Sequence, residues 1–264
     1  MKRASFWSWL WFVVGVLYFA VPLISTLLFS LRAERGTYSL TAYRNVLADP
    51  QFARTFTFSV EIAVLTILFS LLLIVPTVYW VHLKLPQIRP FMEFVAFLPF
   101  VLPAVVLVFG LIRIYSRPPL ALTNTTLTTN LLLIAAYMGL ALPYMYRAVD
   151  TGMRAIDIRT LTEAAQSLGA GWPTIIRRVI FPNLRTALLS GTFLTFAIVI
   201  GEYTIASFLA RPMFGPYLAN LVRNKAYEPA ALSIISFALT WAMMAGLQWV
   251  TQRTPGAQVT AGPR

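Results

Sequence analysis

The sequence contains no cysteine and a single histidine, His82, in 264 residues. The absence of cysteine excludes a disulfide framework, a thiolate nucleophile and a cysteine-ligated metal site. One histidine cannot form a cluster of imidazole ligands, and the scattered acidic residues form no clustered catalytic set. We therefore predict no catalytic residue, no metal site and no cofactor.

Charge is scarce as well. Asp, Glu, Lys and Arg make up 11% of the residues, whereas they make up about 25% of a typical soluble domain. The net charge of +12 would favour nucleic-acid binding in a soluble protein, but no basic run stands out here, and an anionic membrane surface attracts such charge equally well. The sequence also lacks the Gly-x-x-x-x-Gly-Lys-Ser/Thr loop that cradles nucleotide phosphates. We expect the lipid bilayer, and not nucleic acid, as a partner.

Apolar residues are abundant, at 58% of the chain. Six apolar stretches are each long enough to cross about 30 Å of hydrocarbon at about 1.5 Å per residue. They are continuous and show no alternation with a period of two, so they predict helices and not barrel strands. The six stretches are Phe6–Leu31, Phe58–Val81, Phe94–Tyr115, Thr128–Tyr146, Leu188–Leu209 and Ala230–Val250.

The predicted fold class is therefore all-α: a polytopic membrane protein with six transmembrane helices over residues 1–250. Residues 251–264 contain several Pro and Gly residues and predict a disordered tail. An even number of spans places both termini on one side of the membrane. With both termini in the cytoplasm, the inner segments hold twelve Lys and Arg and the outer segments eight, which favours this orientation.

The connection between the fourth and fifth stretches, about residues 150–186, predicts a helix–turn–helix. Gly169 and Gly171 are typical of a helix end followed by a turn, and Pro173 suits the first turn of a second helix. We expect Pro182 to disrupt this second helix near the fifth span. The apolar stripe of the first helix is Ile158, Leu161, Ala164, Ala165 and Leu168, and that of the second is Trp172, Ile175, Ile176 and Val179.

Within this connection the sequence reads Glu163-Ala-Ala-Gln-Ser-Leu-Gly169, then nine residues, then Val179-Ile-Phe-Pro182. This spacing resembles the EAA signature of the permease subunits of binding-protein-dependent ABC importers. That signature is Glu-Ala-Ala, three residues, Gly, nine residues, Ile, one residue, Leu-Pro. Val179 and Phe181 are conservative departures from the usual Ile and Leu.

The resemblance implies the type I permease fold of ABC importers, with a cytoplasmic helix that couples the membrane part to a separate ATPase. It assigns the coupling role to Glu163, Ala164, Ala165, Gly169 and Pro182. A structural alternative for Glu163 is a capping box with Thr160, since Thr160-Leu-Thr-Glu163 fits S/T-x-x-E.

The implied assembly contains a cytoplasmic ABC ATPase dimer, a second six-helix permease subunit that forms a heterodimer with this chain, and an extracytoplasmic solute-binding protein. It would lie in a bacterial inner membrane. The chain would form half of a gated conduit, and would not itself be an enzyme.

Ionisable residues inside the predicted spans are expensive and suggest a role in transport. Glu202 is predicted to line the substrate pathway and attract a cation, with Tyr203 and Trp241 adding cation–π contacts. The alternatives are an ion pair between Glu202 and Arg113, or a purely structural break of the fifth span at Gly201-Glu202. Glu61 joins the tentative pathway, although an interfacial position is the favoured interpretation.

The segment Gly201–Leu209 resembles that of spermidine/putrescine-type permeases, so a polyamine is the predicted cargo. Iron, phosphonate, sulfate or sugar import are alternatives within the same class. An ion-coupled secondary transporter is a more distant alternative, which predicts inverted repeats and charges at the midplane. A membrane-embedded enzyme is disfavoured because the sequence lacks a clustered catalytic set.

Overall fold

The computed structural model describes residues 6–34 and 36–252, and within them regular structure is helical apart from one isolated bridge between Glu34 and Thr37. The all-α fold class is therefore confirmed. The chain divides into two compact units. The first comprises residues 1–54 and 217–242, and the second comprises residues 55–216 and 243–264.

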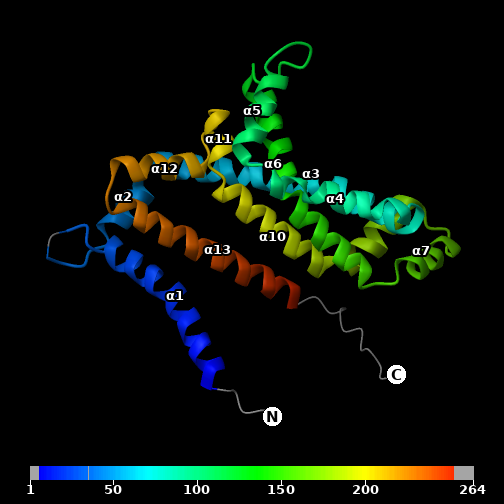
Figure 1. Cartoon of the computed structure of the whole chain (residues 1–264), viewed down its shortest axis with the longest axis horizontal. Helices are drawn as coiled ribbons and strands as arrows, with labels where there is room; N and C mark the ends of the chain where they lie inside the picture. Colours follow the sequence, from blue (N-terminus) through cyan, green and yellow to red (C-terminus); the bar gives the residue numbers. More distant parts are fainter. Residues whose placement is uncertain (1–5, 35, 253–264) are drawn as a thin grey trace. The chain divides into compact units, whose positions relative to one another are not determined.

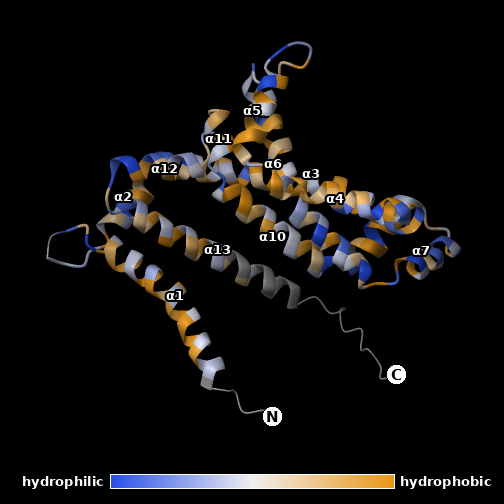
Figure 2. Ribbon diagram, viewed as in Figure 1, coloured by the Kyte–Doolittle hydropathy of each residue, from blue (hydrophilic) through white to orange (hydrophobic). Residues whose placement is uncertain are grey.

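The first unit contains α1 (Phe6–Ser30), α2 (Thr41–Ala48), most of α12 (Phe214–Asn224) and the first part of α13 (Glu228–Gln252). Helix α1 exposes nearly every one of its apolar side chains and is mainly apolar in Figure 2, as expected for a helix whose solvent is lipid.

Hydrogen bonds between side chains connect the helices of this unit to one another. The Ser30 and Tyr43 hydroxyls lie 2.7 Å apart, and Tyr217 donates a hydrogen bond of 2.8 Å to Asp49. Asn45 of α2 donates to Glu228 at the start of α13 over 3.2 Å. The last two bonds join segments from the two ends of the sequence.

Helix α13 covers the predicted sixth span and continues to Gln252. The first two residues of the predicted tail are therefore helical, because the apolar helix has no stop signal at Val250. The rest of that tail, residues 253–264, lies outside the described residues.

The second unit is built around three long helices and the connections between them. Two of the predicted spans are interrupted, and each is followed by a further, shorter helix. In chain order its membrane elements are α3 (Pro50–Lys84), η1 (Pro86–Ile88), α4 (Arg89–Val101), α5 (Ala104–Tyr115), α6 (Thr126–Arg154), α10 (Arg185–Gly201) and α11 (Thr204–Phe208).

The predicted third span is not one helix. The segments Pro86–Val101 and Ala104–Tyr115 meet at an angle of 100°, with Leu102 and Pro103 between them. Pro103 has no N–H to continue the backbone ladder, and Leu102 before it takes an extended conformation. Pro99, by contrast, lies inside α4 without ending it.

The predicted fifth span is also interrupted. Helix α10 ends at Gly201, Glu202 is extended, and α11 begins at Thr204. On the other side of α10, the segment Trp172–Asn183 meets it at an angle of 82°.

Three helices of the described residues, α1, α3 and α6, are long and apolar enough to cross a membrane without a break, and each bent pair adds one crossing if it counts as a single span. The polytopic prediction therefore agrees with the structure, but length and composition give at most five crossings among the described residues and not the predicted six. The predicted sixth span is helical in α13, whose apolar segment Glu228–Ala242 is shorter than a full crossing, and the predicted third and fifth spans are interrupted.

Helices α6 and α10 run side by side in the second unit (Figure 1). Two glycines allow this close approach. A Cβ on Gly152 of α6 would lie 2.5 Å from the Cβ of Ala187, and a Cβ on Gly191 of α10 would lie 2.8 Å from Met145 Sδ. Small residues at a helix crossing let the backbones approach closely. The van der Waals packing that results is a main source of attraction between helices in lipid.

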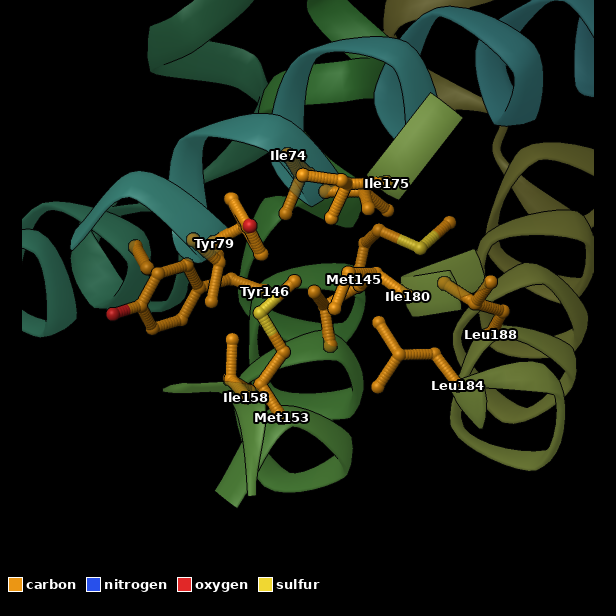
Figure 3. Close-up of a cluster of buried hydrophobic side chains, with 14 of the residues drawn as sticks. Ile74, Tyr79, Met145, Tyr146, Met153, Ile158, Ile175, Ile180, Leu184 and Leu188 are labelled. Carbon is orange, nitrogen blue, oxygen red and sulfur yellow. The ribbon is translucent and has the colours of Figure 1, made fainter. Parts of the chain in front are cut away.

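A buried cluster fills the inner end of the second unit (Figure 3). It combines side chains of α3, α6 and the connection between α6 and α10 with Ala96 of α4 and Leu188 of α10. The cluster residues labelled in Figure 3 are Ile74, Tyr79, Met145, Tyr146, Met153, Ile158, Ile175, Ile180, Leu184 and Leu188. The connection is therefore packed onto the membrane helices and is not a free loop.

We predict that Gly152→Ala destabilises the chain, because its new methyl group would overlap Ala187 and Leu184. Overpacking of this kind costs about 1–3 kcal/mol. Gly139→Ala is the matched control on the same helix, since a Cβ there meets nothing within 4 Å. Thermal midpoints of the detergent-purified proteins would test this, and equal midpoints for the two variants would contradict it.

Candidate functional site

The predicted coupling helix is present as α7 (Ile158–Ser167). Its N-cap is Asp157, whose carboxylate accepts hydrogen bonds from the Thr160 backbone N–H at 3.2 Å and from the Thr160 hydroxyl at 2.7 Å. These bonds lower the pKa of Asp157 below its ordinary value. The capping-box hypothesis for Thr160 and Glu163 is therefore wrong, since the helix already begins two residues before Thr160.

Helix α7 has an inner and an outer face, and the predicted stripe divides between them. Ile158, Thr162 and Ala165 are buried, whereas Ala164 and Leu168 are exposed. At 3.6 residues per turn, position i+6 lies about 120° away from position i, so Ala164 cannot share a face with Ile158. The five-residue stripe is corrected accordingly.

The inner face of α7 is attached to α3. The hydroxyls of Tyr79 and Thr162 lie 2.8 Å apart in a buried position. The ring of Trp172 packs against Tyr79 and Trp80, with centroid distances of 4.7 Å and 4.4 Å. A small cavity of about 190 Å³ opens beside these rings, with Glu163 among its lining residues. Helix α7 and Trp172 are therefore in direct contact with α3.

The outer face of α7 presents small and apolar groups. Leu168 is 89% exposed, and Ala164 and Glu163 beside it are exposed as well. Glu163 has Arg159 at 4.0 Å on the same helix, a distance at which an exposed ion pair contributes little. An exposed leucine next to an alanine and a carboxylate is a surface that another protein can cover.

Gly169 ends α7 through its backbone conformation. Its φ is +77°, and the N–H groups of Gly169 and Ala170 donate to the carbonyls of Gln166 and Ala165. This is the Schellman pattern of helix termination, which favours glycine in the left-handed position. A Cβ on Gly169 would meet no atom within 4 Å, so its constraint is the backbone angle and not a collision.

The second helix of the connection consists of α8 (Trp172–Thr174), a wide π-helical turn η2 (Ile175–Ile180) and α9 (Phe181–Asn183). Ile175 of the predicted stripe is buried, and Arg177 and Arg178 are exposed. Pro182 lies at the start of α9, and the chain bends two residues later, at Leu184.

An ionic network at the inner ends of α3, α4 and α6 was not predicted. Asp150, buried on α6, lies 2.8 Å from His82 Nε2, 2.5 Å from Arg154 and 3.6 Å from Arg89. Arg154 and Arg89 also contact Glu93, at 2.7 Å and 3.4 Å. The sequence shows the i,i+4 spacings of Asp150 with Arg154 and of Arg89 with Glu93, but it does not show that these pairs and His82 meet, because they come from three separate helices.

Glu202 is held at the break between α10 and α11. Its carboxylate accepts hydrogen bonds from the backbone N–H groups of Ile205 at 2.9 Å and Ala206 at 3.1 Å. The hydroxyl of Tyr137, on α6, donates a third bond of 3.0 Å. A Cβ on Gly215 would collide with the Glu202 carbonyl oxygen, so the backbone is enclosed here too. The structural break weighed for this position is therefore present.

The other predicted pathway residues are dispersed. Tyr203 follows Glu202 and is 44% exposed, and Glu61 is exposed on α3. Trp241 is 63% exposed and belongs to the other compact unit, where its ring neighbours Phe237. Among the ion pairs of the described residues, none joins Glu202 to Arg113, which is exposed at the end of α5.

The all-helical membrane fold and the docked surface helix define a membrane transport subunit. Residues 86–254 match the family of binding-protein-dependent transport system inner membrane components, which is well over half of the chain. The chain belongs to this family. The sequence-based assignment is therefore confirmed at the level of this family, whose members are inner membrane components of transport systems and not enzymes.

Two curated relatives illustrate the family. A probable molybdenum ABC transporter permease protein of Haloferax volcanii is 34% identical over 154 residues, covering 58% of this chain and 57% of that protein. A spermidine/putrescine transport system permease protein of Haemophilus influenzae is 30% identical over 125 residues, covering 46% and 48%. The matched stretches thus span about half the length of these relatives.

The fold also matches a solved structure. A bacterial ABC transporter involved in the import of the acidic polysaccharide alginate superposes with a TM-score of 0.70 over 92% of this chain and 93% of that one. At 13% sequence identity this match supports the fold alone.

We predict that Gly169→Val distorts the end of α7, because a β-branched residue strongly disfavours a φ of +77°. Gly169→Asn is the matched control, since asparagine tolerates the left-handed region. Hydrogen–deuterium exchange of residues 158–170 should increase at least several-fold in the valine variant and stay near wild type in the asparagine variant. Equal exchange in both variants would contradict this assignment.

Proposed function

We propose that this chain is the membrane-spanning permease subunit of an ABC importer, forming half of the translocation pathway for a small polar solute. A separate ATPase drives the transport. The observation that carries this proposal is the position of α7, whose inner face is attached to α3 while its outer face is free.

Coupling in this proposal follows from the two faces of α7. The ATPase would cover Ala164 and Leu168, and Glu163 would accept charge-assisted hydrogen bonds from it. Ala165 packs inward, Gly169 provides the sharp exit, and Pro182 belongs to the second helix that leads into α10. A push on α7 would then reach α3 through Thr162 and reach α10 through the bend at Leu184.

The proposed assembly contains two ATPase subunits, a second six-helix permease subunit as a heterodimeric partner, and an extracytoplasmic solute-binding protein. The family description, which names binding-protein-dependent transport, supports the last of these. Both termini are proposed to lie in the cytoplasm, on the same side as α7. The excess of Lys and Arg in the inner segments supports this orientation.

We predict that Leu168→Arg prevents the ATPase from binding while the permease stays folded. Leu168 is 89% exposed, so the substitution removes no internal packing. Burying a leucine at an interface contributes about 1.5–3 kcal/mol, and its loss alone lowers affinity by about tenfold or more. The measurement is co-purification with the cognate ABC ATPase co-expressed with this chain.

Leu40→Arg is the control for this experiment. Leu40 is 58% exposed and lies in a connection predicted to face the opposite side of the membrane. Equal recovery of the ATPase with Leu168→Arg and Leu40→Arg would exclude the outer face of α7 as the docking surface.

The polyamine cargo stays a prediction. The spermidine/putrescine relative supports it, but another relative is a probable molybdenum permease, so the relatives do not single out one solute. Glu202, the group expected to attract a cation, already accepts three internal hydrogen bonds. The proposed function therefore does not depend on Glu202 as a cation site. Iron, phosphonate, sulfate and sugar remain alternatives.

We predict that Glu202→Gln lowers the folded yield and leaves uptake per assembled complex unchanged. The glutamine amide would replace one carboxylate oxygen by a donor facing a backbone N–H, and an unsatisfied donor in such a site costs about 1–3 kcal/mol. Yield and uptake would be measured in the same preparations, with Tyr137→Phe as the variant that removes one donor and keeps the carboxylate. Normal yield with reduced spermidine uptake per complex would instead support the polyamine pathway.

A further inference from the structure

Two large grooves of similar size mark the second unit, and their chemistry differs. One encloses about 700 Å³ and is lined only by apolar and tryptophan side chains of α3 and of the segment from α8 to α9, such as Leu72 and Phe181. The other, which we name the polar groove, encloses about 680 Å³ between α4, α6 and α10. Its polar side chains are Tyr144, Arg147, Thr151, Asn183, Thr186 and Ser190.

This difference indicates what each groove faces. Lipid offers no hydrogen-bonding groups, so the apolar groove is suited to acyl chains. A charged side chain on a membrane helix instead faces a water-filled cavity or the interior of a helix bundle. In the polar groove this charge is that of Arg147, whereas the Asn183 amide and the Ser190 hydroxyl donate to the backbone carbonyls of Val179 and Thr186. The polar groove lies along the C-terminal half of α6, and its residues on α10 occupy the first three turns of that helix.

Arg147 gives the polar groove an unbalanced positive charge. Its guanidinium carbon lies 5.8 Å from the centre of the Phe97 ring, and none of the ion pairs among the described residues includes it. Arg89 and Arg154 nearby are different, because Asp150 and Glu93 pair with both. The described residues that line the polar groove include no carboxylate.

We infer that the polar groove is the inner section of the cargo pathway and that Arg147 makes it selective for anionic over cationic solutes. This inference rests on the proposed function. A fixed charge between low-dielectric walls concentrates ions of the opposite sign and raises their encounter rates by about tenfold or more. A polyamine would meet an uncompensated like charge in the same place.

The absence of cysteine from the sequence allows a direct test. Ser190→Cys places one thiol in the polar groove, and Leu72→Cys places one in the apolar groove, where Leu72 is 73% exposed. Each protein is treated, in inside-out vesicles, with a methanethiosulfonate carrying a sulfonate or a trimethylammonium group. Each rate is divided by the rate of the same reagent with 2-mercaptoethanol in solution.

The thiol of Ser190→Cys should react with both reagents, with a normalised preference of about tenfold for the sulfonate. Adding Arg147→Gln should abolish this preference, whereas Arg147→Lys should keep it. Arg185→Gln, at the first residue of α10 and outside the groove lining, is the control that should keep it as well. The thiol of Leu72→Cys should react with neither reagent.

Two outcomes would overturn the inference: no reaction of Ser190→Cys with either reagent, or a preference that Arg147→Gln does not change. In the assembled importer, ATP-dependent spermidine uptake that is equal with and without Arg147→Gln would also overturn it, whereas a tenfold loss of sulfate or phosphate uptake would support it. The labelling needs no ATPase, so its result is separate from that of the Leu168→Arg co-purification, which tests the proposed function.

Discussion

The close packing of α6 against its neighbours is the interaction on which the rest of the second unit depends. At its inner end Gly152 lets Ala187 of α10 approach, and further along Met145 contacts Gly191. In lipid this approach replaces the hydrophobic effect as the source of helix association, because acyl chains are as apolar as the side chains. On the same helix, Tyr137 donates a hydrogen bond to Glu202, and Asp150 forms the centre of the ionic network.

The helix breaks illustrate a second constraint, since peptide groups in hydrocarbon must find internal partners. After the break at Gly201, the first N–H groups of α11 are satisfied by the Glu202 carboxylate. Tyr137 supplies the remaining contact from α6. A residue that looks like a cargo site in the sequence is thus explained by the needs of the backbone around it.

The proposed coupling helix and the proposed cargo pathway occupy different surfaces of the second unit. Helix α7 and the rings around Trp172 pack on α3, whereas the polar groove lies between α4, α6 and α10. The bend at Leu184 joins the two, because Leu184 belongs to the buried cluster and precedes α10 directly. The ionic network of Asp150 braces the same region, and removal of one partner from a buried ion pair is strongly destabilising.

The sequence by itself determined the elements that depend on local chemistry. Long apolar runs predict the membrane helices, and Gly169 predicts the end of α7, because a left-handed residue there requires only the backbone. The spacing from Glu163 to Pro182 indicated the family, which the match over residues 86–254 shows.

Tertiary structure alone decided which side chains meet. The burial of Ala165 beside an exposed Ala164 and the partners of Asp150 depend on packing between helices distant in sequence. The same holds for the charge of Arg147, which is unbalanced only because Asp150, three residues later, faces α3 and α4. A one-dimensional pattern places residues on a helix, but the neighbours of that helix decide what each residue contacts.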